Sequence, residues 1–237
     1  MIEEKASEKT NTNKDLPLTQ VKMMQALDWA YEKSMTGLTG QGDINALVED
    51  YLSKSNYNCE VAIAKLIKSQ KTKASTSGFV TGFGGVITMP ITIPANVASV
   101  LLIQMRMIAA IATMRGYDLK SDQVKTFVYA TLAGTSVADI VKRTGITIGN
   151  KTLSSTVNKI SGKTLTRINQ AVGYRLITKS GTKGTINLWK AIPIAGALVG
   201  GSFDFFTTSV VANRAKKTFA KNGINVGEGI TIDKSDC

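Results

Sequence analysis

The chain has 237 residues, of which 43% are hydrophobic, so it can bury a substantial core as one domain and is not globally disordered. It contains no histidine, which excludes histidine-dependent nucleophilic triads, H-E-x-x-H metalloprotease sites and histidine-ligated metals. The net charge of +12 indicates an anionic partner: nucleic acid, anionic lipid headgroups or an acidic protein.

The positive charge is concentrated in the middle of the chain. Residues 1–60 carry a net charge of −4, residues 61–222 carry +18, and residues 223–237 carry −2. The positive charges of residues 61–222 repel one another unless an anion lies beside them. Aromatic residues make up only 6% of the chain and no nucleic-acid recognition motif is present, so anionic lipid is favoured over nucleic acid.

The polar residues 1–18 predict a disordered N-terminal segment. They contain no apolar stretch after a basic start, so we expect no secretory signal and a protein that stays in the cytosol. Cys59 and Cys237 are too few for a disulfide framework.

Three helices are predicted next. Apolar side chains recur at helical spacing over residues 19–36. Asp43 is a candidate N-cap for a helix that runs to about residue 54, and Asn58 is a candidate N-cap for the following helix. This third helix has an apolar stripe on one side and lysines on the other.

A long apolar run follows over residues 78–114, with Arg106 as its single charge. Glycines and two prolines come first, and the part from Ala95 to Met114 predicts one helix. Its twenty residues are about the length needed to cross the hydrocarbon core of a membrane.

Two or three further helices precede the second apolar run. Ser121 is a candidate N-cap for a helix that ends near residue 133, and a shorter helix is predicted around residues 136–143. Residues 145–162 predict a loop, and residues 164–179 predict a basic amphipathic helix.

The second apolar run covers residues 191–212, with Asp204 as its only charge. Its glycines have the small-xxx-small spacing that lets two helix backbones approach closely. Across both runs the candidate helix-packing glycines are Gly78, Gly82, Gly196, Gly200 and Gly201.

The predicted fold class is all-α: a compact multi-helix bundle with two long apolar, glycine-containing helical segments and no substantial sheet. The β-branched patches Ile146–Ile148 and Ile230–Ile232 are not joined by a hairpin turn. We expect a disordered segment at 1–18, one helical domain at 19–222 and an extended or disordered tail at 223–237.

The two apolar runs admit two interpretations. They can insert into a membrane, flanked by cytoplasmic lysine and arginine, or they can form the buried core of a soluble bundle. Arg106 favours the core, because an arginine at the bilayer centre costs at least about 2.5–3.5 kcal/mol. Two runs of this length are more than a small soluble core needs, so a peripheral protein that switches between both states fits both observations.

The isolated charges suggest a buried ion pair, because a buried charge is tolerated mainly when it is paired. The pair we expect is Arg106 with Asp204, in a structural role; Asp139 is the other candidate, although Arg143 lies four residues on and can form a surface bridge with it. The basic residues expected to face a membrane surface are Lys68, Lys71, Lys73, Arg167, Arg175, Lys179, Arg214, Lys216 and Lys217.

No catalytic constellation is visible. Gly162-Lys163-Thr164 is similar to the end of a phosphate-binding P-loop, but Val157 stands where the first glycine belongs. The basic region has only four scattered aspartates, too few for a clustered acid–base or two-metal site. We therefore expect no catalysis, no cofactor and no metal.

Several stretches in order together resemble the EcsC protein family, over roughly residues 20–220. They are Ala26 to Lys33, Gly78 to Asn96, Gln104 to Ala112, Arg115 to Asp118, Ile168 to Leu176, Lys183 to Leu188 and Pro193 to Asp204. The family takes its name from a component encoded beside an ABC transporter, so the resemblance implies a bacterial protein with a transport-associated or membrane-associated role. Some members are labelled proteases, which the absence of histidine does not support here.

The expected function is that of a membrane-associated accessory protein that binds anionic lipid and assists a transporter or another membrane protein. Its expected location is the cytoplasm, peripheral to or inserted in the inner membrane. One alternative is a membrane-permeabilising effector whose glycine-bearing helices oligomerise into a pore. The other is a soluble binding module for a protein or nucleic-acid partner.

Overall fold

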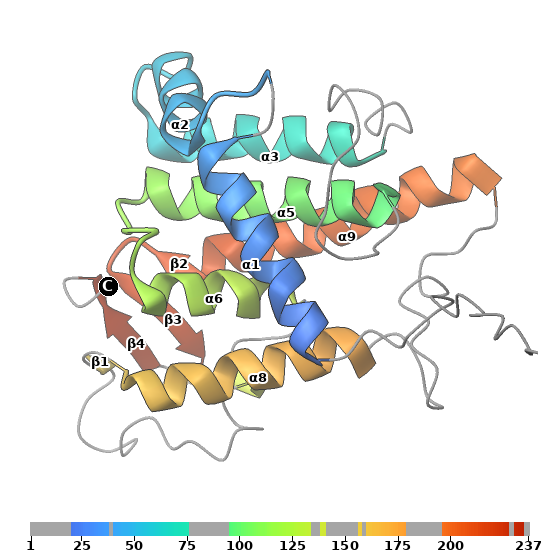
Figure 1. The fold of residues 1–237 in the computed structure, drawn as a ribbon. Helices are drawn as coiled ribbons and strands as arrows, with labels where there is room; N and C mark the ends of the chain where they lie inside the picture. The colour runs from blue at the N-terminus through green and yellow to red at the C-terminus, as the bar shows by residue number, and fades with distance from the viewer. Residues whose placement is uncertain are drawn as a thin grey trace, which may run out of the picture.

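The computed structural model describes residues 20–37, 40–75, 95–133, 138–140, 156–157, 160–178, 196–227 and 230–234. Figure 1 shows a layered helical bundle with a small sheet at one end, so the predicted mainly helical fold is confirmed. The helices are α1 (Gln20–Thr36), α2 (Ile44–Ser53), α3 (Cys59–Ser75), α5 (Ala95–Met114), α6 (Asp122–Leu132), α8 (Gly162–Thr178) and α9 (Gly196–Thr218). The strands are β1 (Thr156–Val157), β2 (Phe219–Ala220), β3 (Gly223–Gly227) and β4 (Ile230–Asp233).

Helix α5, the first apolar run, is the central helix of the bundle. It packs against α1, α2, α3, α6 and α9. The turns from Met107 to Ala112 are fully buried, which explains why the segment is apolar on every side. Among the residues that the structure describes, no helix is long and apolar enough to cross a membrane.

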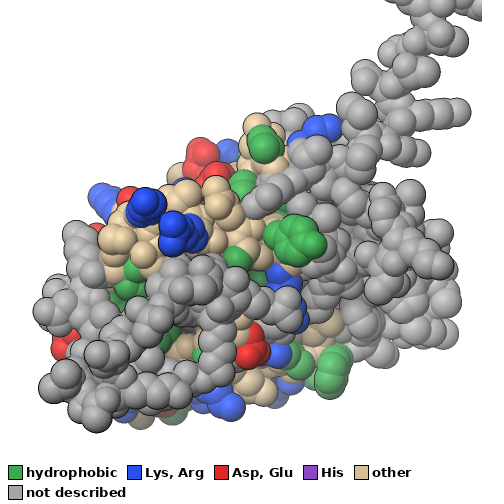
Figure 2. All heavy atoms as spheres, turned by 90° about the horizontal axis from the view of Figure 1, so that it is seen from below, with side chains coloured by type: hydrophobic (Ala, Val, Ile, Leu, Met, Phe, Trp, Pro, Cys, Tyr) green, Lys and Arg blue, Asp and Glu red, His purple; other side chains and the backbone are tan. Residues whose placement is uncertain are grey.

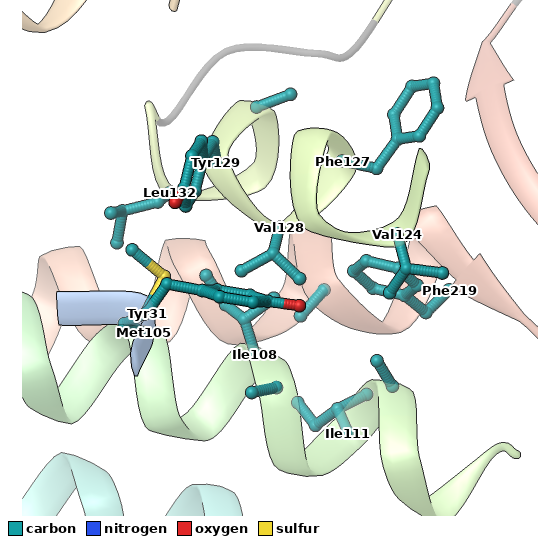
Figure 3. Packing of buried hydrophobic residues seen from close by; sticks show 14 of the residues in the cluster. Tyr31, Met105, Ile108, Ile111, Val124, Phe127, Val128, Tyr129, Leu132 and Phe219 are labelled. Carbon is teal, nitrogen blue, oxygen red and sulfur yellow. The ribbon is translucent and has the colours of Figure 1, made fainter. Parts of the chain in front are cut away.

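The core lies where α1, α5 and α6 meet (Figure 3). Helix α6 buries all but two of its eleven residues, and its Val128 lies over Ile108 of α5 in Figure 3. The rings of Tyr31 and Tyr129 meet edge to face with centroids 5.6 Å apart, and the Tyr31 hydroxyl donates to the Leu119 carbonyl at 2.7 Å. This hydrogen bond satisfies a hydroxyl that would otherwise be buried alone.

The three predicted N-caps are confirmed. The Asp43 carboxylate accepts from Ala46 N at 2.8 Å, and the Asn58 side-chain oxygen accepts from Val61 N at 3.1 Å. Ser121 Oγ accepts from Val124 N at 3.5 Å. These side chains satisfy amides that the first helical turn leaves free, which is why helix starts were readable from the sequence.

The predicted C-terminal tail needs correction, because most of it belongs to a sheet. The strand order is β1-β4-β3-β2, with β1 parallel to β4 and the other pairs antiparallel. Ile224, Val226 and Ile232 are buried, so residues 223–233 extend the hydrophobic core. The patch Ile230–Ile232 lies in β4 and pairs antiparallel with β3, a partner strand that the sequence analysis did not identify.

Other boundaries shift by a few residues. The predicted basic helix is α8, and the second apolar run is helical from Gly196 onward in α9, which continues past the run to Thr218. Of the short helix predicted at 136–143, the structure describes residues 138–140, which are helical. Residues 1–18 and the patch Ile146–Ile148 lie outside the described residues.

Candidate functional site

Arg106 does not pair with Asp204, so the predicted ion pair is wrong. Its guanidinium extends from α5 toward the turn between α1 and α2, where Nη1 donates to the Ser34 carbonyl at 3.2 Å. Nη2 donates to the carbonyls of Gly42 and Asp43. Burial lowers the pKa of Arg106 from its ordinary value, and the charge of Asp43 partly offsets this. The long side chain reaches carbonyl oxygens at element ends, which a sequence pattern cannot indicate.

Asp204 is half-buried on α9, and its carboxylate makes no hydrogen bond or ion pair within the described ranges. Burial raises its pKa above the ordinary value. The polar link between α5 and α9 is made instead by Gln104, whose amide donates to Thr208 Oγ1 at 3.2 Å and lies 3.4 Å from Thr207 Oγ1.

Asp139, the other candidate partner of Arg106, interacts electrostatically with a different arginine, Arg214. It is exposed, and its charge raises the pKa of Arg214. The pKa of Arg214 is nevertheless lowered overall, first by burial and then by the like charge of Arg175. Arg143, the predicted surface partner of Asp139, lies outside the described residues.

The predicted basic residues do not form one membrane-facing surface. Lys68, Lys71 and Lys73 lie on α3, while Arg167 and Arg175 lie on α8, at the opposite side of the bundle in Figure 1. Seen from the α8 side, the lysine and arginine side chains form separate groups among hydrophobic and acidic ones (Figure 2). The expected basic surface is therefore divided between two faces.

The basic residues near the end of α9 are partly used inside the protein. Lys216 Nζ lies 3.8 Å from a Glu60 oxygen, and its backbone carbonyl accepts from Arg115 at 2.7 Å. Arg214 is half-buried, whereas Lys217 is exposed. Lys179 lies outside the described residues.

Only some of the candidate helix-packing glycines lie among the described residues. Gly196, Gly200 and Gly201 lie in the first turns of α9, whereas Gly78 and Gly82 lie outside the described residues. Their predicted role in close helix packing stays a prediction.

Aromatic side chains accompany the lysines of α3. Lys71 Nζ lies 4.2 Å above the ring of Phe205 on α9, a cation–π contact. Phe205 is 43% exposed and Phe206 is 66% exposed, although both rings are large and apolar. Lys68, Lys71, Phe205 and Phe206 are called the basic–aromatic surface below. The sequence signal for this surface is the pair of adjacent phenylalanines beside Asp204, but nothing in the apolar run indicates that they are exposed.

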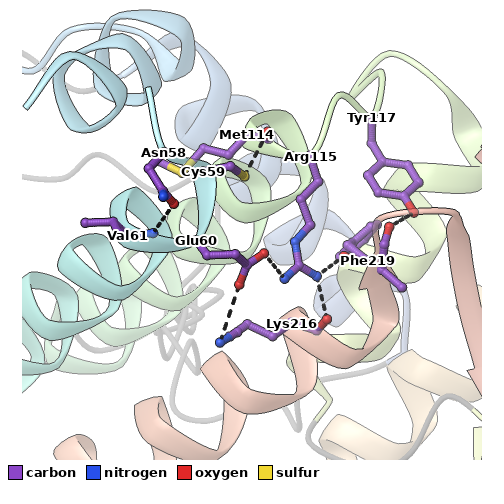
Figure 4. Close-up of polar contacts among 10 residues, drawn as sticks. Asn58, Cys59, Glu60, Val61, Met114, Arg115, Tyr117, Lys216 and Phe219 are labelled. Atoms are coloured by element: carbon purple, nitrogen blue, oxygen red, sulfur yellow. Dashed lines mark hydrogen bonds and ion pairs between the residues drawn. The ribbon is translucent and has the colours of Figure 1, made fainter. Parts of the chain in front are cut away.

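Arg115 is the centre of a structural polar cluster (Figure 4). It donates to Glu60 on α3 at 2.8 Å and to the carbonyls of Lys216 and Phe219, while Tyr117 donates to the Ala220 carbonyl. Partial burial would raise the pKa of Glu60, but the hydrogen bond and charge of Arg115 outweigh it and the pKa lies below its ordinary value. The cluster joins α3, the end of α5, α9 and the sheet.

A second polar cluster lies between α1 and α6. Asp28 accepts from the Tyr129 hydroxyl at 2.8 Å and pairs with Lys125 at 2.7 Å. Burial raises the pKa of Tyr129, and Asp28 raises it further, so the phenol keeps its proton at neutral pH. Within the part of the chain that is described, no group of three or more His, Cys, Asp or Glu side chains could hold a metal ion.

A cavity of about 310 Å³ opens between α1, α2, α3 and α5. Arg106 lies in its wall, together with Lys33 and the buried Gln70. The sequence could not reveal it, because its walls come from four helices separated by up to about seventy residues.

Comparisons with known proteins agree with the resemblance. The profile of the EcsC protein family matches residues 2–221. A Bacillus subtilis (strain 168) protein called "Uncharacterized protein YdbA" is 27% identical over 163 residues, which is 66% of this chain and 55% of that protein. The chain thus spans about half the length of this relative. No solved structure is significantly similar to it.

Proposed function

The chain belongs to the EcsC protein family, and from this premise we propose that it is a peripheral accessory protein that binds anionic membrane lipid through its basic–aromatic surface. In this proposal it works at the cytoplasmic face of the inner membrane and assists a transporter or another membrane protein. The observation that carries the proposal is the contact between Lys71 and the exposed ring of Phe205, with Phe206 beside it.

Exposed phenylalanines beside lysines suit the membrane–water interface. Burying a fully exposed phenylalanine side chain contributes about 1.5–3 kcal/mol, and these two rings are roughly half exposed. Each lysine near an anionic surface adds about 1 kcal/mol. The four side chains together therefore support a weak, reversible attachment of the kind that a single lipid chain gives.

The packing of α5 supports a peripheral mode of attachment. Its apolar surface is already covered by five neighbouring helices, so its insertion into lipid would require the bundle to open. Phe205 and Phe206 need no such opening, because they are exposed in the folded state and the N-terminal end of α9 projects beyond α3 and α5 (Figure 1).

The test is sedimentation with vesicles of phosphatidylcholine, with and without phosphatidylglycerol. We expect binding only to the anionic vesicles, and we expect Phe205→Ser with Phe206→Ser to weaken it about tenfold or more. Lys68→Gln with Lys71→Gln should weaken it most at low ionic strength, because salt screens exposed charges.

Matched controls lie on α8. Tyr174 is 62% exposed, close to the 66% of Phe206, and Lys163 and Arg167 are exposed on the same helix. Tyr174→Ser is therefore matched to Phe206→Ser alone, and Lys163→Gln with Arg167→Gln removes the same charge as Lys68→Gln with Lys71→Gln. We expect neither control to change binding. Equal losses from both helices would contradict the proposed surface, and no binding at low salt would overturn the function. Release of a trapped dye would favour the pore-forming alternative.

A further inference from the structure

We propose that the cavity between α1, α2, α3 and α5 binds a small organic phosphate, with Arg106 and Lys33 neutralising the phosphate and Gln70 donating a hydrogen bond to it. This inference is independent of the basic–aromatic surface, because none of the four residues that define that surface lies in the cavity wall.

The cavity wall carries an excess of positive charge. Arg106, Lys33 and Lys73 lie in it, and Asp50 is its one described carboxylate. Asp50 already pairs with Lys54, whose Nζ lies 2.6 Å away. The cationic side chains thus outnumber the acidic one, so the cavity attracts anions.

Arg106 is the strongest indication of an anionic ligand. Its three hydrogen bonds go to neutral backbone carbonyls, and no described carboxylate forms an ion pair with it. A guanidinium has five N–H groups, so donors remain for a ligand in the cavity. The charge of Asp43 only partly offsets the burial of Arg106, and a bound phosphate would supply a direct counter-charge.

Gln70 gives a second, independent indication. It is only 3% exposed and lies in the cavity wall, yet its side-chain amide has no hydrogen bond within the described ranges. Because no described protein group binds this amide, it is available to a ligand in the cavity. Its NH₂ group can donate to a phosphate oxygen.

The volume of the cavity and its apolar wall residues limit the class of ligand that it can bind. About 310 Å³ is the lower end of small-molecule sites, and Leu47, Leu102 and Ile103 form an apolar part of the wall. A phosphate ester with a short uncharged group, such as glycerol phosphate or the headgroup of a phospholipid, fits this volume and can place its uncharged part against the apolar wall. A further cavity, lined by Asp28, Asp122 and Lys125, has more acidic than basic side chains and does not share this preference.

The test uses the full chain and isothermal titration calorimetry with inorganic phosphate and with glycerol 3-phosphate. We expect saturable binding that Lys33→Gln weakens about tenfold or more, because the substitution removes one charge-assisted contact to the phosphate. Gln70→Glu should abolish binding, because it places a carboxylate against the phosphate. Gln70→Leu should weaken binding without adding charge, and Lys217→Gln, an exposed change outside the cavity, is the matched control.

A parallel arm uses vesicles that contain phosphatidic acid, compared with phosphatidylglycerol vesicles of equal charge. Preference for phosphatidic acid that depends on Lys33, without binding of glycerol 3-phosphate, assigns the cavity to a lipid headgroup. Saturable binding of glycerol 3-phosphate assigns it to a free ester. Absence of both, or binding that Lys33→Gln and Gln70→Glu leave unchanged in folded protein, overturns the inference.

Discussion

Arg106 and Asp204 are the single charges of the two apolar runs, and their surroundings in the fold differ. The arginine side chain reaches the Ser34 carbonyl in the last turn of α1, where the helix end carries partial negative charge. The aspartate side chain is short and finds no described donor, so its burial is uncompensated. Because both charges are isolated in apolar sequence, burial could be predicted for each of them. Their interaction partners could not be predicted in this way.

The uncompensated carboxylate leads to a prediction for Asp204→Asn. Because burial raises the pKa of Asp204 in the folded state, its contribution to stability is complete below the ordinary carboxyl pKa and is lost as pH rises through the folded pKa. The asparagine variant has no such loss. We expect it to unfold at a higher temperature than the wild type at pH 7, with the difference closing below about pH 4.

Thermal unfolding followed by circular dichroism across this pH range checks the prediction. Glu32→Gln, on the exposed side of α1, is the control, because it removes one negative charge without relieving a buried one. A gain in stability for Asp204→Asn that is the same at pH 7 and pH 4 would show that the carboxylate is not the cause.

At the scale of single elements, local signals predicted the helices well. The predicted bounds of α5 match the structure, because Pro94 can only begin a helix and Gly116, at a positive φ of 77°, ends one. The helix starts at Asp43, Asn58 and Ser121 were readable for the same local reason. The sheet was missed because β1 and β2 have two residues each, too few for any periodic signal.

The cap of α3 gives a prediction at this scale. Asn58→Ala removes the acceptor for Val61 N and should cost about 1 kcal/mol of unfolding free energy. Asn58→Ser keeps an acceptor and should retain most of the stability. Urea unfolding of both variants measures the difference, and equal losses would mean that the side-chain oxygen does not act as the cap.

The candidate sites could not be predicted, because each joins elements that are distant in the sequence. Lys71 and Phe205 are brought together only by the packing of α3 on α9. Gln70 belongs to a helix whose sequence predicted one apolar and one basic side, and nothing local indicates that this polar residue is buried. Sequence reasoning identified the charged residues, whereas the fold determined which of them share a surface.

At the scale of the whole molecule, the helical bundle and the sheet share one core. Helix α9 continues directly into β2, where the fully buried Phe219 meets the Tyr117 ring with centroids 5.3 Å apart. The Arg115 side chain binds the backbone on both sides of this junction. Because β4 lies between β1 and β3, it also connects the end of the chain to residues 156–157.

This shared core predicts that damage to the sheet destabilises the helices. Ile232 is fully buried in β4, so Ile232→Ala should cost about 2–5 kcal/mol of unfolding free energy. Thr231→Ala, at the only partly buried neighbouring position, should cost clearly less. If bundle and sheet are one unit, helical circular dichroism and tryptophan fluorescence will lose signal in one coincident transition, shifted equally by Ile232→Ala. A helical transition that keeps its wild-type midpoint in this variant would show that the sheet folds apart from the bundle.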